Sequence, residues 1–158
     1  MIFTASPEVG IKPGRCVNQP ACLEDIMPTL LALAGLQPPS RFDGVDLTPT
    51  LRGKEQTLRP WLHFEHAPCY SKPQAYHAMT DGRYKYIWRP TDGSEQLFDL
   101  DNDPTERKNL AAQKASAELL ATWRGRMIKR LTPRPEGFVQ NGKLIAGRPY
   151  KPLNAGML

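Results

Sequence analysis

The run His63-Phe64-Glu65-His66 is the one local cluster of side chains in this 158-residue chain that could carry out chemistry. Imidazole and carboxylate groups bind metal ions, transfer protons and hold anions. Successive side chains of a β-strand point to opposite faces, so His63 and Glu65 should share one face while His66 points away. The three residues are therefore not expected to converge on a metal ion. At the end of the strand the geometry is freer, which leaves a binding role open.

The cluster lies where the hydrophobic pattern changes to a period of two. Alternation of apolar and polar residues predicts four β-strands, at residues 61–66, 75–79, 84–89 and 96–100. Turn signals at Asp81-Gly82 and at residues 91–94 separate the last three strands, because a tight hairpin favours such residues. These strands should form an antiparallel meander, to which the first run adds a fourth strand.

A long amphipathic helix is predicted at residues 113–131. Its apolar side chains recur at three- and four-residue steps and form a core-facing stripe: Leu119, Leu120, Trp123, Met127, Ile128 and Leu131. Tyr84, Tyr86 and Trp88 share one face of the sheet and could stack on a sugar or a base, but packing against the helix is favoured. The predicted fold class is α+β, with a four-stranded antiparallel sheet packed against a long C-terminal helix.

The N-terminal part carries a different signal. Asp25 can cap a helix at residues 24–34, Pro28 falls in its first turn, and Gly35 marks its end. Apolar residues occupy every side of this helix, so we expect it to be buried nearly all round. A smaller copy of the start signal predicts a second, very short helix at residues 47–51.

Three regions are expected along the chain. They are residues 1–60, with the two short helices, residues 61–131, with the sheet and long helix, and residues 132–158, a basic tail rich in proline and glycine. Asn141-Gly142 predicts one more hairpin within the tail. The 40% hydrophobic and 23% charged fractions are typical of a globular protein.

Composition also limits the partners. No apolar run approaches the roughly 20 residues that span a bilayer, and the first residues lack the pattern of a secretory signal. We therefore expect no membrane partner and favour a cytoplasmic location. The C-terminal residues 113–158 carry nine basic and two acidic groups, with only three aromatic residues, Trp123, Phe138 and Tyr150, among them. A solvated helix face and tail are thus favoured over nucleic-acid binding.

Cys16 and Cys22 could bridge, although free thiols are favoured because the cysteine count is odd.

Three blocks occur in an order that resembles the C-terminal region of sulfatases, the sulfate-ester hydrolases of the alkaline phosphatase superfamily. The blocks contain Asp25-Ile26-Met27-Pro28-Thr29-Leu30, Phe42-Asp43-Gly44-Val45 and Thr80-Asp81-Gly82-Arg83-Tyr84-Lys85-Tyr86-Ile87. The resemblance implies that residues 1–60 are the trailing edge of an α/β catalytic domain and that the sheet and long helix follow it.

The resemblance also implies which catalytic parts to seek. Sulfatases use a formylglycine made from the first residue of Cys-x-Pro-x-Arg or Ser-x-Pro-x-Arg; the nearest match, Ser71-Lys72-Pro73, has Ala75 where arginine belongs. Their cation, usually calcium, needs oxygen ligands, and Asp101-Asn102 has suitable residues in the wrong place. An acidic turn that caps the next helix is favoured over a calcium loop there. We expect this chain to bind no cofactor and to be inactive alone, with calcium and formylglycine in a missing N-terminal catalytic domain.

In the sulfatase fold the C-terminal sheet lies beside the active-site cleft. The resemblance thus implies that His66, with His63 or Lys72, lines the substrate pocket of the intact enzyme and favours an anionic or hydroxylated substrate. The alternative is that these are ordinary strand and loop residues. For the whole chain, the alternative is a stand-alone interaction or dimerisation module. An exposed apolar surface, with self-association, is expected if the first helix normally meets strands that this chain lacks.

Overall fold

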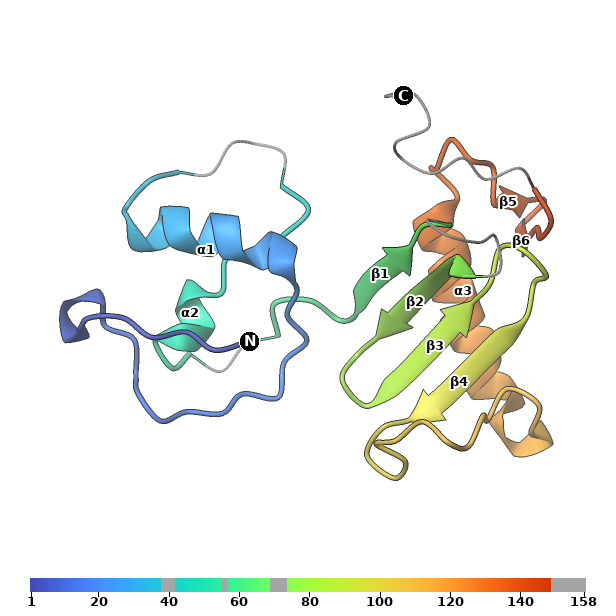
Figure 1. The fold of residues 1–158 in the computed structure, drawn as a ribbon, viewed down its shortest axis with the longest axis horizontal. Coiled ribbons are helices and arrows are strands. Elements are labelled where there is room, and N and C mark those ends of the chain that lie inside the picture. Colours follow the sequence, from blue (N-terminus) through green and yellow to red (C-terminus); the bar gives the residue numbers. More distant parts are fainter. Residues whose placement is uncertain (38–41, 55–56, 69–73, 149–158) are drawn as a thin grey trace. The chain divides into compact units, whose positions relative to one another are not determined.

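The computed structural model describes residues 1–37, 42–54, 57–68 and 74–148, and Figure 1 shows their arrangement. The chain divides into two compact units, Met1–Leu62 and His63–Leu158. The first holds short helices and loops, and the second holds an antiparallel sheet with a long helix.

Among its described residues, the first unit contains two α-helices and two 3-10 turns. Its elements are η1 (Pro7–Val9), η2 (Leu23–Asp25), α1 (Ile26–Leu33) and α2 (Thr48–Leu51). Both helices lie where the sequence predicts them. Gly35 and Gly53 follow them with φ values of +72° and +87°, which glycine adopts without a steric penalty.

Asp25 does not cap α1 in the way the sequence predicts, because its side chain makes no cap hydrogen bond to that helix. The carboxylate instead accepts hydrogen bonds from the backbone N–H groups of Cys22 and Val45, at 2.9 and 2.8 Å, and pairs with Arg59. It thereby ties η2 to the loop before α2. Gly44 is needed in that loop, since a Cβ there would lie 2.0 Å from the Glu24 carbonyl oxygen.

The prediction that α1 is buried nearly all round is wrong for the chain as described. Its buried residues are Pro28 and Thr29, whereas Met27 is 58% exposed and Leu30 is 55% exposed. The Thr29 hydroxyl accepts a hydrogen bond from Leu47 N–H at 3.0 Å, which joins α1 to the start of α2. The packed side of α1 is thus partly polar, while Met27 and Leu30 face outward.

The second unit is built on a four-stranded sheet in the order β1-β2-β3-β4. The strands are β1 (Leu62–His66), β2 (Tyr76–Thr80), β3 (Tyr84–Trp88) and β4 (Glu95–Asp99). The antiparallel register pairs His77 with Trp88 across β2 and β3, and Tyr86 with Leu97 across β3 and β4. The predicted α+β fold and its meander are confirmed.

A long helix, α3 (Ala117–Leu131), lies against one face of this sheet (Figure 1). It follows a 3-10 turn, η4 (Lys114–Ser116), so the predicted helix begins close to the expected position. The residues that fill the space between helix and sheet are fully buried and large: Trp88, Trp123, Tyr86, Phe138, Met79, Leu97, Met127 and Leu131. Burial of Tyr86 and Trp88 confirms packing against the helix and leaves no open stacking platform on them.

The predicted hairpin near the C-terminus is present. It consists of β5 (Val139–Gln140) and β6 (Lys143–Leu144), which pair in antiparallel register. Asn141 and Gly142 both have positive φ, at 50° and 71°, as the tight turn requires. Phe138, directly before β5, is fully buried and brings this hairpin to the main core.

Candidate functional site

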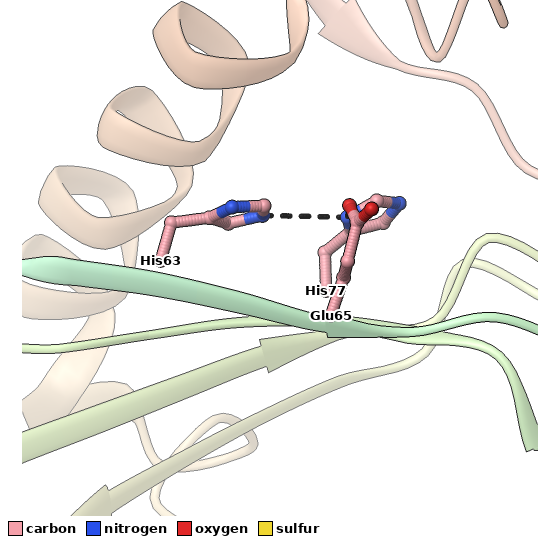
Figure 2. A group of neighbouring side chains, drawn as sticks. All are labelled: His63, Glu65 and His77. Atoms are coloured by element: carbon pink, nitrogen blue, oxygen red, sulfur yellow. Dashed lines mark hydrogen bonds and ion pairs between the residues drawn. The ribbon is translucent and has the colours of Figure 1, made fainter. Parts of the chain in front are cut away.

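Three titratable side chains meet on one face of the sheet, as Figure 2 shows. His77 Nδ1 lies 3.3 Å from His63 Nε2 and 3.1 Å from Glu65 Oε2. One ligand atom from each of the three residues lies within 4.8 Å of the other two. This His63–Glu65–His77 cluster is the candidate site.

Neighbouring strands position the cluster. His63 and Glu65 share a face of β1, as strand alternation predicts, and His77 projects from β2 to the same side (Figure 2). The His77 ring is fully buried. It stacks on Trp88 with ring centroids 5.8 Å apart and meets the edge of Phe138 at 4.9 Å. These aromatic contacts fix the ring, so the cluster has a rigid base.

Charges from the segment after α3 surround Glu65. Arg134 Nη2 lies 3.2 Å from Glu65 Oε1 and also binds Glu136 Oε1 at 2.7 Å. The hydrogen bond from His77 lowers the pKa of Glu65, and the charge of Arg134 lowers it further. Burial acts in the opposite direction, and together these effects bring the pKa of Glu65 to about 2. Burial, followed by the charge of His77, lowers the pKa of His63 to about 4. At neutral pH the cluster therefore combines a carboxylate with an uncharged imidazole.

The sequence-predicted site residues are not brought together. His66 points to the other side of β1, where its ring stacks on Tyr76 with centroids 5.7 Å apart. Its buried Nδ1 has no hydrogen-bond partner among residues of the described ranges. Lys72 lies outside the described residues. The structure thus separates His66 from His63 and joins His63 to His77, which the sequence analysis did not single out.

The sequence contains His77 in a predicted strand, but its proximity to His63 depends on how two strands pair. His77 and His63 belong to adjacent predicted strands, yet the register of β1 against β2 depends on a connection that includes residues 69–73. A one-residue slip would have placed His77 on the opposite face. Local alternation therefore could not identify the pair.

The residues of the cluster do not fit calcium, the cation implied by the resemblance to sulfatases. Calcium takes six to eight oxygen ligands, whereas two of the three donors here are imidazole nitrogens.

The carboxylates of the acidic turn, Asp99 and Asp101, contact other residues of the protein instead of a cation. Asp99 Oδ2 accepts a hydrogen bond from Asn102 Nδ2 at 2.9 Å, and Arg83 pairs with both aspartates. Asp103 accepts from Lys108 N–H and so orders the turn, whereas the predicted cap on the following helix is not formed.

Three arginines of the basic C-terminal stretch contact other residues of the protein. Arg124 binds Glu95 Oε2 at 2.6 Å, Arg134 binds two glutamates, and Arg126 lies 4.4 Å above the ring centre of Trp123. Lys129 and Arg130 are exposed, in agreement with the predicted solvated helix face. Cys16 and Cys22 are free thiols, as the sequence favours.

No helix in the described ranges has the length and apolar character needed to cross a membrane.

Comparison with known proteins places these features in a family. The family described as N-sulphoglucosamine sulphohydrolase, C-terminal, matches residues 4–132. An arylsulfatase from Clostridium perfringens is 32% identical over 142 residues, which is 90% of this chain and 29% of the relative. A Delta 4,5-hexuronate-2-O-sulfatase from Bacteroides thetaiotaomicron is 36% identical over 68% of this chain and 23% of the relative.

A solved structure agrees with this result. A 2-O GAG sulfatase is 28% identical, superposes with a TM-score of 0.65, and matches 81% of this chain and 30% of that chain. The chain thus spans less than a third of the length of these relatives. Because the family match covers the whole four-stranded sheet, α3 and both helices of the first unit, the chain belongs to the C-terminal family of sulfatases.

Proposed function

We propose that this chain acts as the C-terminal part of a sulfuric ester hydrolase of the arylsulfatase type. Its role is to complete the fold of a catalytic portion and to wall the substrate cleft. The nucleophile, as formylglycine, and the calcium ligands belong to that N-terminal portion, which is the partner of this chain. Two findings support this proposal. The family match covers residues 4–132, and the chain corresponds to only 29% of the length of the Clostridium perfringens arylsulfatase.

The observation that carries the proposal is the apolar surface of the first unit. Leu23, Met27, Leu30 and Leu36 are 77%, 58%, 55% and 57% exposed around α1. A run that is apolar on all sides is typical of a helix enclosed by other elements. The catalytic portion of a sulfatase would cover this surface, and without it the surface would promote self-association.

The substrate role is assigned to the second unit. His66, together with His63 or Lys72, would line the pocket and select an anionic or hydroxylated substrate. His66 supports this role because its buried Nδ1 lacks a hydrogen-bond partner in the described part of the chain. His63 points to the opposite face of β1, so it would contact a different part of the ligand from His66.

A reconstitution experiment tests the proposal. The full chain would be co-expressed with the N-terminal portion of the Clostridium perfringens arylsulfatase, and co-purification and hydrolysis of an aryl sulfate would be measured. We expect a complex that hydrolyses the ester, while the chain alone does not. Charged substitutions at the exposed apolar positions, Met27→Lys with Leu30→Lys, should prevent complex formation.

A matched control keeps the test specific. The double substitution Lys114→Glu with Lys129→Glu alters exposed positions of the second unit and should leave the complex intact. The chain alone should associate in sedimentation velocity, and Met27→Lys with Leu30→Lys should make it monomeric. A wild-type chain that is monomeric alone and forms no complex would contradict the proposal. Hydrolysis by the isolated chain would contradict it equally.

A further inference from the structure

We propose that the His63–Glu65–His77 cluster binds a transition-metal dication, with zinc as the best fit. Two imidazole nitrogens and one carboxylate oxygen form a ligand set used by zinc sites that keep a fourth position open. Such a set suits zinc and its neighbours far better than calcium or magnesium. This inference does not depend on the proposed sulfatase function, since all three ligands lie within this chain.

Two of the three distances between the ligand atoms suit a single bound ion, and the third pair of atoms lies within 4.8 Å. Bonds of about 2.0–2.1 Å in a tetrahedral site place neighbouring ligand atoms about 3.3 Å apart. His77 Nδ1 lies 3.1 Å from Glu65 Oε2 and 3.3 Å from His63 Nε2. The protein therefore holds two edges of the required tetrahedron before any ion binds. In the metal-bound state the neutral His77 ring would carry its hydrogen on Nε2, which leaves the lone pair of Nδ1 free to bind the ion.

The surroundings give the site a rigid side and a partly exposed side. Trp88 and Phe138 hold the ring of His77 from within the core. The side chain of Glu65 is 24% exposed although its Oε2 atom is buried, so an ion would enter past this carboxylate, whose side chain would move to admit it. A site of this form has the open position of catalytic rather than structural zinc.

Arg134 acts as an outer partner of the ligating carboxylate. It contacts Glu65 Oε1, whereas the ligand atom is Oε2, so both contacts can exist together. Outer hydrogen bonds of this kind orient metal-binding carboxylates. Glu136 binds the same guanidinium at 2.7 Å and offsets its charge near the ion.

Metal titration of the full chain tests the inference. After treatment with a chelator, Zn²⁺ would be titrated by calorimetry, and Co²⁺ would be added as a spectroscopic probe of geometry. We expect one zinc ion per chain and the visible absorption of tetrahedral cobalt. Glu65→Gln and His63→Gln should weaken zinc binding by at least about tenfold. Removing a ligand should reduce the zinc affinity more than removing a residue that only hydrogen-bonds to a ligand, which typically costs about tenfold or more.

His66→Gln is the matched control, because His66 lies on the same strand but on the opposite face. It should bind zinc like the wild type. If the cluster variants fail to fold, the wild-type chain alone still tests the inference. Zinc should raise the thermal midpoint of its unfolding, and the rise should persist after its cysteines have been alkylated. Absence of zinc binding by the wild type would overturn the inference. Unchanged binding by Glu65→Gln, or loss of binding on His66→Gln or on alkylation, would also overturn it.

Discussion

The two units of this chain bury their apolar residues to very different extents. The second unit encloses two tryptophans, Tyr86 and Phe138 with at most 2% exposure. The first unit buries polar residues, including Asp25 and Thr29, while Met27 and Leu30 are more than half exposed. Hydrophobic stabilisation scales with the apolar area removed from water. The second unit therefore has its own core, and the first depends more on hydrogen bonds and on what covers it.

Replacement of Trp123 by alanine should show the largest effect. Trp123 is 1% exposed and packs between α3 and the sheet, so Trp123→Ala should lower the free energy of unfolding of the second unit by about 3–5 kcal/mol. Urea unfolding followed by circular dichroism would measure it. The comparison variant Leu30→Ala, at an exposed site of α1, should change stability by no more than about 0.5 kcal/mol. Equal losses in both variants would contradict the contrast between the units.

Replacement of Asp25 should disrupt the first unit alone. Asp25→Asn keeps the shape but removes the charge that compensates Arg59, which is only 10% exposed. Leaving one member of a buried pair uncompensated should cost about 3 kcal/mol. Hydrogen exchange at the α1 amides would detect the loss, and the exposed Asp43→Asn should have almost no effect. Faster exchange in β3 would show that the two units are not independent.

Acid should affect the first unit through the same carboxylate. Burial tends to raise the pKa of Asp25, but hydrogen bonds from Arg59, Cys22 and Val45 outweigh it and lower the pKa below its ordinary value of 3.8. The stabilisation is therefore present above that value and is lost as the pH falls through the lower folded pKa. Exchange of the α1 amides should accelerate in this range for the wild type. The Asp25→Asn variant should lack this pH dependence.

The smallest expected effect comes from Arg124. Its side chain is 41% exposed and binds Glu95, which also accepts a hydrogen bond from the Tyr86 hydroxyl. Arg124→Ala should lower the free energy of unfolding of the second unit by about 1 kcal/mol or less, since solvent screens the pair. Thermal unfolding at low and high salt would measure it. The difference from the wild type should shrink as salt is added.

The sequence predicts the second unit better than the first for a physical reason. Its strands, turns and helix follow from local signals, such as Asp81-Gly82, Asn141-Gly142 and the apolar stripe of α3. The same signals give the positions of α1 and α2. They do not reveal which side of α1 is covered, because that depends on residues distant in sequence. The same holds for Asp25: its carboxylate binds the nearby Cys22 N–H before η2 rather than an amide of α1, and its other partners, Val45 and Arg59, are distant in sequence.

The candidate site was only half predictable. Alternation along β1 correctly puts His63 and Glu65 on one face and His66 on the other. The third member, His77, joins them through strand pairing, and Arg134 reaches Glu65 from a segment 69 residues away. Such contacts depend on the register of the sheet and on the packing after α3, neither of which is encoded by a short motif.

Hydrogen exchange of the full chain, alone and with the N-terminal portion of the Clostridium perfringens arylsulfatase, tests the contrast between the units most directly. Amides of β2, β3 and α3 should be protected in both samples, because their core is complete. Amides of α1 should exchange quickly in the isolated chain and slow markedly when the catalytic portion is added. If α1 is as protected as β3 in the isolated chain and does not respond to that portion, the first unit is complete in itself and the sulfatase assignment of its apolar surface is wrong.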